Sequence, residues 1–212
     1  MIGRGKKLKK HLMWGALFLV LGSANSMAIE EAIYTSIFID ENFETRYYEP
    51  QILAEIEVDG DFEGAGSNAF SQLFGYISGE NTSQKKIKMT APVAQIHSGD
   101  MLEMTAPVGQ QQKNGQWLVS FMMPSGYSLE ELPEPKDSTI NLRQLPARYV
   151  ASVRYSGFWT ERGYLHHLDL LNRWISSQEL HASGAPIWAR YNAPYVPWFM
   201  RRNEILIPIK KP

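Results

Sequence analysis

The sequence predicts an α+β fold, namely a distorted antiparallel β-barrel with two flanking helices and approximate internal twofold symmetry. Three observations support this prediction. Several short stretches alternate apolar and polar residues, which is the pattern of strands that bury one face. Two longer segments repeat apolar residues at helical spacing. The order strands, helix, strands occurs twice along the chain, with the proline-rich span 132–136 between the two halves.

The alternating stretches predict four strands whose apolar side chains share one face. Such one-sided burial favours antiparallel pairing, because parallel sheets are usually covered on both faces. The predicted apolar faces are Ile52, Ala54, Ile56 and Val58; Trp117, Val119, Phe121 and Met123; Tyr149, Ala151, Val153 and Tyr155; and Ile205, Ile207 and Ile209.

The helical spacing predicts a first helix over residues 62–77, with Phe70 and Phe74 on a stripe beside its main apolar face. A second helix is expected to begin after Thr160, which is a good N-cap residue. Its apolar face consists of Tyr164, Leu165, Leu168, Leu171 and Ile175.

The five residues Met-Thr-Ala-Pro-Val occur twice, beginning at Met89 and at Met104. Residues 98–100 (Ser-Gly-Asp) form a turn signal between the copies, which predicts that they lie on the two arms of a hairpin. Proline has no backbone donor, so Pro92 and Pro107 are expected at sheet edges or bulges. The Met, Ala and Val side chains would share one face. Such a face could line a cavity, or it could be the wall of a barrel that packs on a helix. The periodicity favours the barrel wall.

Residues 1–28 have the pattern of a signal peptide. Five basic residues precede an apolar run at 12–21, and the small residues Ser26 and Ala28 indicate cleavage after Ala28. The apolar run is about half the roughly 20 residues that a membrane span needs. We therefore expect a mature domain over 29–212 with no stable membrane span, located in the periplasm of a Gram-negative source. The alternative is an uncleaved membrane anchor.

Charge and composition narrow the possible functions. Cleavage would remove five of the 21 basic residues and none of the 22 acidic ones, so the mature domain is net negative and nucleic acid is not an expected partner. The chain has no cysteine, which excludes disulfides and thiolate chemistry. It has no His-Glu-x-x-His metal motif and no Gly-x-Ser-x-Gly nucleophile motif. We therefore expect neither enzyme activity nor a protein-bound metal site.

Several stretches in order resemble the SOUL haem-binding protein family over nearly the whole mature chain. They are residues 43–50 (Phe-Glu-Thr-Arg-Tyr-Tyr-Glu-Pro), 69–81, 86–93, 121–124 (Phe-Met-Met-Pro), 145–148 (Leu-Pro-Ala-Arg), 191–194 (Tyr-Asn-Ala-Pro) and 201–204 (Arg-Arg-Asn-Glu). The resemblance implies a distorted antiparallel barrel with two flanking helices, which agrees with the periodicity.

The resemblance also implies that haem or another porphyrin binds in an apolar groove beside the first helix. The matching groove residues are Phe70, Leu73, Phe74 and Ile77, and Met89 of the repeated block is a further candidate. Aromatic side chains can stack on a planar macrocycle.

The same resemblance points to further positions that bear on haem binding. Tyr47 stands at the position of a histidine that is proposed as an axial ligand in one branch of the family. Ser67 and Gln72 occupy helix positions where animal members carry basic residues for the haem propionates. Lys85, Lys86, Lys88 or a C-terminal arginine such as Arg201 or Arg202 would have to supply that charge here.

The resemblance favours a non-catalytic protein that binds a tetrapyrrole or a similar flat apolar molecule. Two other interpretations stay open from the sequence. One is a periplasmic interaction module with no small ligand, and the other is a hydrolase or lyase built on a related effector-binding barrel.

Overall fold

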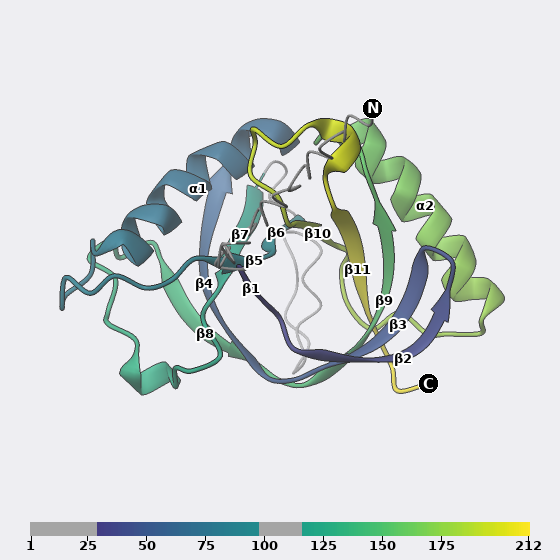
Figure 1. Ribbon diagram of the computed structural model, residues 1–212, viewed down its shortest axis with the longest axis horizontal. Coiled ribbons are helices and arrows are strands. Elements are labelled where there is room, and N and C mark those ends of the chain that lie inside the picture. The colour runs from purple at the N-terminus through teal and green to yellow at the C-terminus, as the bar shows by residue number, and fades with distance from the viewer. Residues whose placement is uncertain (1–28, 98–115) are drawn as a thin grey trace, which may run out of the picture.

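The computed structural model describes residues 29–97 and 116–212. Both expected helices are present, and Figure 1 shows how they and the strands are arranged. The strands are β1 (Glu30–Glu31), β2 (Tyr34–Asp40), β3 (Phe43–Tyr48), β4 (Gln51–Asp59), β5 (Thr90–Ala91), β6 (Val93–His97), β7 (Gln116–Met122), β8 (Asn141–Leu145), β9 (Arg148–Tyr155), β10 (Ile187–Arg190) and β11 (Asn203–Ile209). The helices are α1 (Phe62–Ser78) and α2 (Glu161–Ser177), with short 3₁₀ turns at Leu129–Glu131 and Trp198–Met200.

Within the described chain, nine strands form one curled sheet in the order β2-β3-β9-β11-β10-β6-β7-β4-β8. All neighbours in this sheet are antiparallel. The sheet is an open half-barrel with the helices along its outer side (Figure 1). Outward from the β10–β6 junction, the order β10-β11-β9-β3 mirrors the order β6-β7-β4-β8. Helix α2 follows β9 and α1 follows β4, which confirms the expected twofold arrangement.

The two faces of the sheet have different roles. The apolar faces predicted for β4, β7, β9 and β11 all pack toward the helices in one core that includes Leu73, Leu171 and Trp188. Helix α1 packs on β4 and β7, while α2 packs on β9 and β11. The opposite, inner face carries a smaller cluster formed by Tyr48, Val150, Ile187, Ala189 and Leu206. The predicted alternation is therefore confirmed.

The helix ends follow from local hydrogen bonds. The Asp61 carboxylate accepts a bond from the Gly64 N–H at the start of α1, and the Thr160 hydroxyl accepts one from the Gly163 N–H at the start of α2. Helix α1 ends at Gly79, which has a φ of 118°. Glycine adopts this conformation at little cost. Neither helix in the described residues is long and apolar enough to cross a membrane.

The first copy of the repeated block lies where two strands meet. Thr90 and Ala91 form β5, which pairs in parallel with β1, and Val93 begins β6. Pro92 therefore lies at a break in the strand, as expected from its missing donor. The buried Thr90 hydroxyl donates to the carbonyl of Met122. The second copy and the predicted turn lie outside the described residues.

Candidate ligand-binding site

The outer flank of α1 carries the two aromatic residues that the sequence indicated. The rings of Phe70 and Phe74 stack with centroids 5.8 Å apart and planes 10° apart. Phe70 is half-buried and meets the edge of Phe121 on β7, with the centroids 5.3 Å apart. Phe74 is 46% exposed. Because Phe121 holds Phe70 in place, the pair presents a fixed apolar surface to solvent.

The other predicted groove residues lie beneath this surface. Leu73 is fully buried and Ile77 is 3% exposed, and both belong to the core between α1 and the sheet. Met89 is half-buried against the same core. These three residues support the flank of α1, whereas Phe70 and Phe74 form its accessible part.

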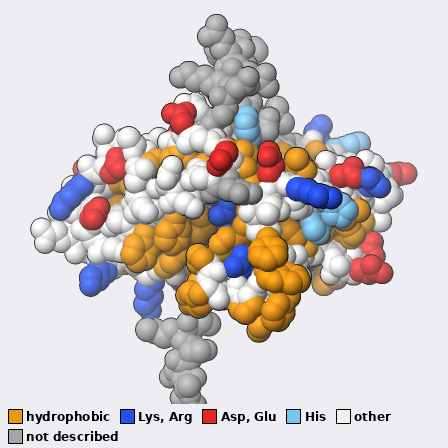
Figure 2. Space-filling model, turned by 90° about the horizontal axis from the view of Figure 1, so that it is seen from above, with side chains coloured by type: hydrophobic (Ala, Val, Ile, Leu, Met, Phe, Trp, Pro, Cys, Tyr) orange, Lys and Arg blue, Asp and Glu red, His pale blue; other side chains and the backbone are white. Residues whose placement is uncertain are grey.

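A loop between β10 and β11 adds exposed aromatic side chains next to the helices. Phe158 stacks on Trp198 of this loop with centroids 5.3 Å apart. The exposed apolar residues of the loop are Tyr195 (89%), Trp198, Phe199 and Met200. Seen from above, apolar side chains gather in a protruding group and in a second area beside it (Figure 2). This side of the molecule thus exposes more apolar surface than scattered single residues would give.

Arginine and tryptophan side chains connect this loop to α1. The Arg201 guanidinium lies 4.3 Å from the centroid of the Trp159 ring and donates to the carbonyls of Val196 and Pro194. The Arg190 guanidinium lies over the Trp188 ring and approaches Gly66 of α1 so closely that a Cβ there would be 2.9 Å from Nη1. A side chain at position 66 would therefore require the Arg190 guanidinium to shift. Sequence reasoning missed Trp159 and Arg190, because no local pattern marks a cation stacked on an indole.

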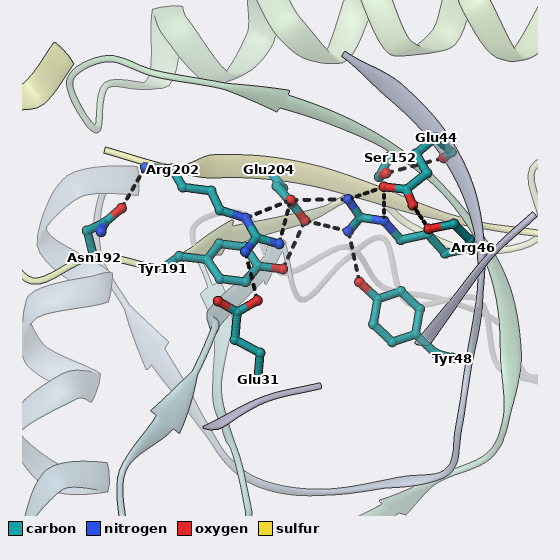
Figure 3. Close-up of polar contacts among 10 residues, drawn as sticks. Glu31, Glu44, Arg46, Tyr48, Ser152, Tyr191, Asn192, Arg202 and Glu204 are labelled. Carbon is teal, nitrogen blue, oxygen red and sulfur yellow. Dashed lines mark hydrogen bonds and ion pairs between the residues drawn. The ribbon is translucent and has the colours of Figure 1, made fainter. Parts of the chain in front are cut away.

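Arg202, the other predicted anion partner, belongs to a buried ionic network (Figure 3). It donates to Glu204 at 2.9 Å and to Glu31 at 2.7 Å, and it lies over the Tyr191 ring. Glu204 is fully buried and also accepts bonds from Arg46 at 2.6 Å and from the Tyr191 hydroxyl at 2.9 Å. The network joins β1, through Glu31, to β3 and β11. The positive charge of Arg202 is therefore already balanced by Glu31 and Glu204.

The electrostatics of this network keep Glu204 ionised. Burial alone would raise the pKa of its carboxyl, but the hydrogen bond and charge of Arg46, together with Arg202, outweigh burial and lower that pKa below 4.5. Burial, together with the nearby Glu204 charge, raises the pKa of Tyr191 well above 10. The tyrosine therefore stays protonated and donates to the carboxylate.

Tyr47 lies in the half of the sheet that carries α2. It is on β3, half-buried, with its ring 5.1 Å from that of Tyr149. Four strands, β9, β11, β10 and β6, separate β3 from β7, on which α1 packs. Measured along the curled sheet, five strand spacings of 4.7–4.9 Å separate β3 from β7. The Tyr47 ring contacts Tyr149, whereas the rings of Phe70 and Phe74 contact each other.

Among the described residues, no group of three or more His, Cys, Asp or Glu side chains is placed to hold a metal ion. The His167 ring stacks on Tyr155 with centroids 3.8 Å apart, and its Nδ1 lies 2.8 Å from the carbonyl oxygen of Gly163. Burial lowers the pKa of His167. It is therefore a packed, neutral histidine at neutral pH.

Comparison with known proteins identifies relatives along most of the chain. A family model described as SOUL heme-binding protein matches residues 29–208. Heme-binding protein 1 of Xenopus tropicalis is 26% identical over 164 residues, which cover 77% of this chain and 81% of the relative. Heme-binding protein 2 of Homo sapiens is 26% identical over 169 residues, with coverages of 77% and 76%.

Solved structures share the fold at low sequence identity. The C-terminal domain of EcmrR aligns with a TM-score of 0.55 at 12% identity, covering 85% of this chain and 99% of that one. A hydrolase from Listeria innocua aligns with a TM-score of 0.52 at 11% identity, covering 87% and 95%. Identities this low show a common fold only.

Proposed function

The chain belongs to the SOUL haem-binding protein family, and we propose that it binds haem or a similar tetrapyrrole, without catalysis, on the outer flank of α1. The stacked pair of Phe70 and Phe74 is the observation that carries this placement. A flat macrocycle can continue such a stack, and aromatic pairs of this kind add about 0.5–1.5 kcal/mol beyond area burial. The family relationship supports haem as the ligand.

The charges near this flank support binding that is mainly apolar. Ser67 and Gln72 on α1 offer no positive charge to the propionates. Arg202 is held by Glu204 and Glu31, and Arg201 by two backbone carbonyls. Affinity would then come from burying the macrocycle, at roughly 25 cal/mol per Å². We therefore expect weak binding with little salt dependence and no strong preference for iron.

Titration of haemin and of protoporphyrin IX tests this proposal. Phe74→Ala is expected to weaken the binding of both ligands about equally, because it removes half of the aromatic stack. Phe38→Ala is a matched control, since Phe38 on β2 is 48% exposed but lies at the far edge of the sheet. Tyr47→Phe is also expected to leave both affinities unchanged. Tight, haemin-selective binding that is lost in Tyr47→Phe and kept in Phe74→Ala would refute the proposed site.

A second candidate is an interaction module without a small ligand, which the exposed loop residues Tyr195, Phe199 and Met200 favour. Such residues commonly mark contacts between proteins. The interaction module is the better account if two results are obtained. Neither haemin nor protoporphyrin IX binds the protein, and a native partner that binds the wild type does not bind the Phe199→Ser variant.

We further propose that the protein is exported to the periplasm and cleaved after Ala28. The basic and apolar pattern of residues 1–28 supports this. Native protein from the periplasmic fraction is expected to begin at Ile29. Native protein that retains Met1 would contradict cleavage.

A further inference from the structure

The inner face of the sheet, opposite the helices, contains a pocket of about 360 Å³. Side chains from the smaller apolar cluster line it, including Tyr48, Ile187 and Leu206. Ala94 and Ile96 of β6 and Leu53 of β4 extend the same wall, and neither helix contributes to it. The volume is near the lower end of the range typical of small-molecule sites. This pocket is separate from the aromatic flank of α1.

One wall of the pocket holds a cation with unused donors. Arg148 begins β9, and its Nη2 donates to the Gln51 side chain at 3.0 Å. Its Nε and Nη1 are buried and have no hydrogen-bond partner among the described residues. The guanidinium also lies 5.3 Å from the centroid of the Tyr48 ring. Buried donors without partners are rare, because each one costs free energy.

Nearby arginines are paired, in contrast to Arg148. Arg143, which also lines the pocket, is bound by both oxygens of Glu55 at 2.7 and 3.0 Å. Arg46 and Arg202 share Glu204. No aspartate or glutamate of the described chain lines the pocket. Burial, together with the neighbouring Arg143 charge, lowers the pKa of Arg148 to about 10, so it remains a cation at neutral pH.

We propose that this pocket binds a small apolar molecule with one carboxylate, which accepts a hydrogen bond from the unpartnered Nη1 of Arg148 while its apolar body lies against Ile96, Ile187 and Leu206. A hydrogen bond from a guanidinium N–H to a carboxylate is charge-assisted and about twice as strong as a neutral one. The ligand supplies the anion that the protein itself lacks there, and the apolar wall excludes strongly hydrated inorganic anions. This site is independent of the proposed haem site.

Calorimetric titration of the full protein with decanoate and with 1-decanol tests the proposal. The two probes share the same chain length and differ in the carboxylate. Decanoate is expected to bind about 10- to 100-fold more tightly than decanol, which is the effect of charge-assisted hydrogen bonds. Arg148→Met keeps a long apolar side chain and is expected to abolish that preference. Arg173→Met removes an exposed arginine of α2 and is expected to change nothing.

A second variant makes the test independent of the folding of Arg148→Met. Ala94→Phe places a large ring in the pocket and is expected to abolish binding of both probes, while haemin binding at α1 persists. Equal affinity for decanoate and decanol, or unchanged decanoate binding in either pocket variant, overturns the proposal. Loss of haemin binding in Ala94→Phe and Arg148→Met would also overturn it, because the pocket would then be the haem site. Loss of haemin binding in Phe74→Ala alone bears only on the haem proposal.

Discussion

Glu204 shows how single residues hold the two sides of the structure together. Its carboxylate is fully buried and accepts hydrogen bonds from Arg46, Arg202 and Tyr191, which come from three different parts of the chain. Removing one partner of a buried ion pair typically costs 3–5 kcal/mol, because the other charge stays buried. Such a network contributes strongly to stability only while every member keeps its charge.

The first residue-scale prediction concerns Glu204→Gln. At pH 7 it is expected to reduce the free energy of unfolding by about 3 kcal/mol in urea. Because the folded pKa of Glu204 lies below 4.5, its contribution is complete above about pH 4.5 and is lost as pH falls through the folded pKa. The difference between wild type and variant should therefore shrink steadily as the pH falls below about 4.5.

The exposed pair of Asp169 and Arg173 on α2 provides the control for this prediction. Asp169→Asn is expected to cost less than about 1 kcal/mol at any of these pH values. A difference between wild type and Glu204→Gln that stays constant down to pH 3 would contradict the role assigned to Glu204.

The sequence revealed some of these residues and not others. Helical spacing placed Phe70 and Phe74 on a flanking stripe and Leu73 and Ile77 on the main apolar face, and that is how the structure arranges them. Spacing identifies the face of a helix but not the depth at which the face is buried. The partnership of Arg46 with Glu204 joins positions 158 residues apart, so no local pattern could indicate it.

At the scale of elements, the repeated block is explained by strand geometry. Proline interrupts the ladder between β5 and β6, and the buried Thr90 hydroxyl ties β5 to the end of β7 through the Met122 carbonyl. This polar contact joins two strands and is not part of the aromatic flank of α1. The block therefore has an architectural role in the first copy.

Thr90→Val tests that role. It keeps the shape of the side chain but removes the donor to Met122, so unfolding in urea should become easier by about 1–3 kcal/mol. Haemin affinity should remain unchanged, since the contact is structural. Thr82→Val, at an exposed position, is the matched control and should cost little. A loss of haemin binding in Thr90→Val without a loss of stability would assign the block to the ligand site.

Element boundaries could be predicted where local chemistry decides them. Thr160 was recognisable as an N-cap, and both helices begin within a residue or two of the predicted positions. The short β1–β5 pair was not predicted, because two-residue strands show no periodicity. Its parallel pairing brings residues 30–31 beside residues 90–91, which are 60 positions later in the chain, so only the tertiary structure reveals it.

At the scale of the whole molecule, the strand order explains why the two faces differ. Each half contributes one helix to the outer face, so the inner face is left without a helix cover. The twofold arrangement could be predicted from the repeated order of strands and helix. The inner pocket could not, because its lining comes from strands of both halves and no local pattern shows that the side chain of Arg148 lacks an acidic partner.

The central claim is that the tetrapyrrole lies on the outer flank of α1, and amide NMR of the protein with haemin tests it most directly. Ferric iron broadens the signals of nearby amides, whereas metal-free protoporphyrin IX occupies the same place without doing so. We expect haemin-specific broadening around Phe70 and Phe74 and sharp signals at Tyr47 and Arg148. Broadening centred on the inner-face strand β9 at Arg148, or on β3 at Tyr47, would contradict the account.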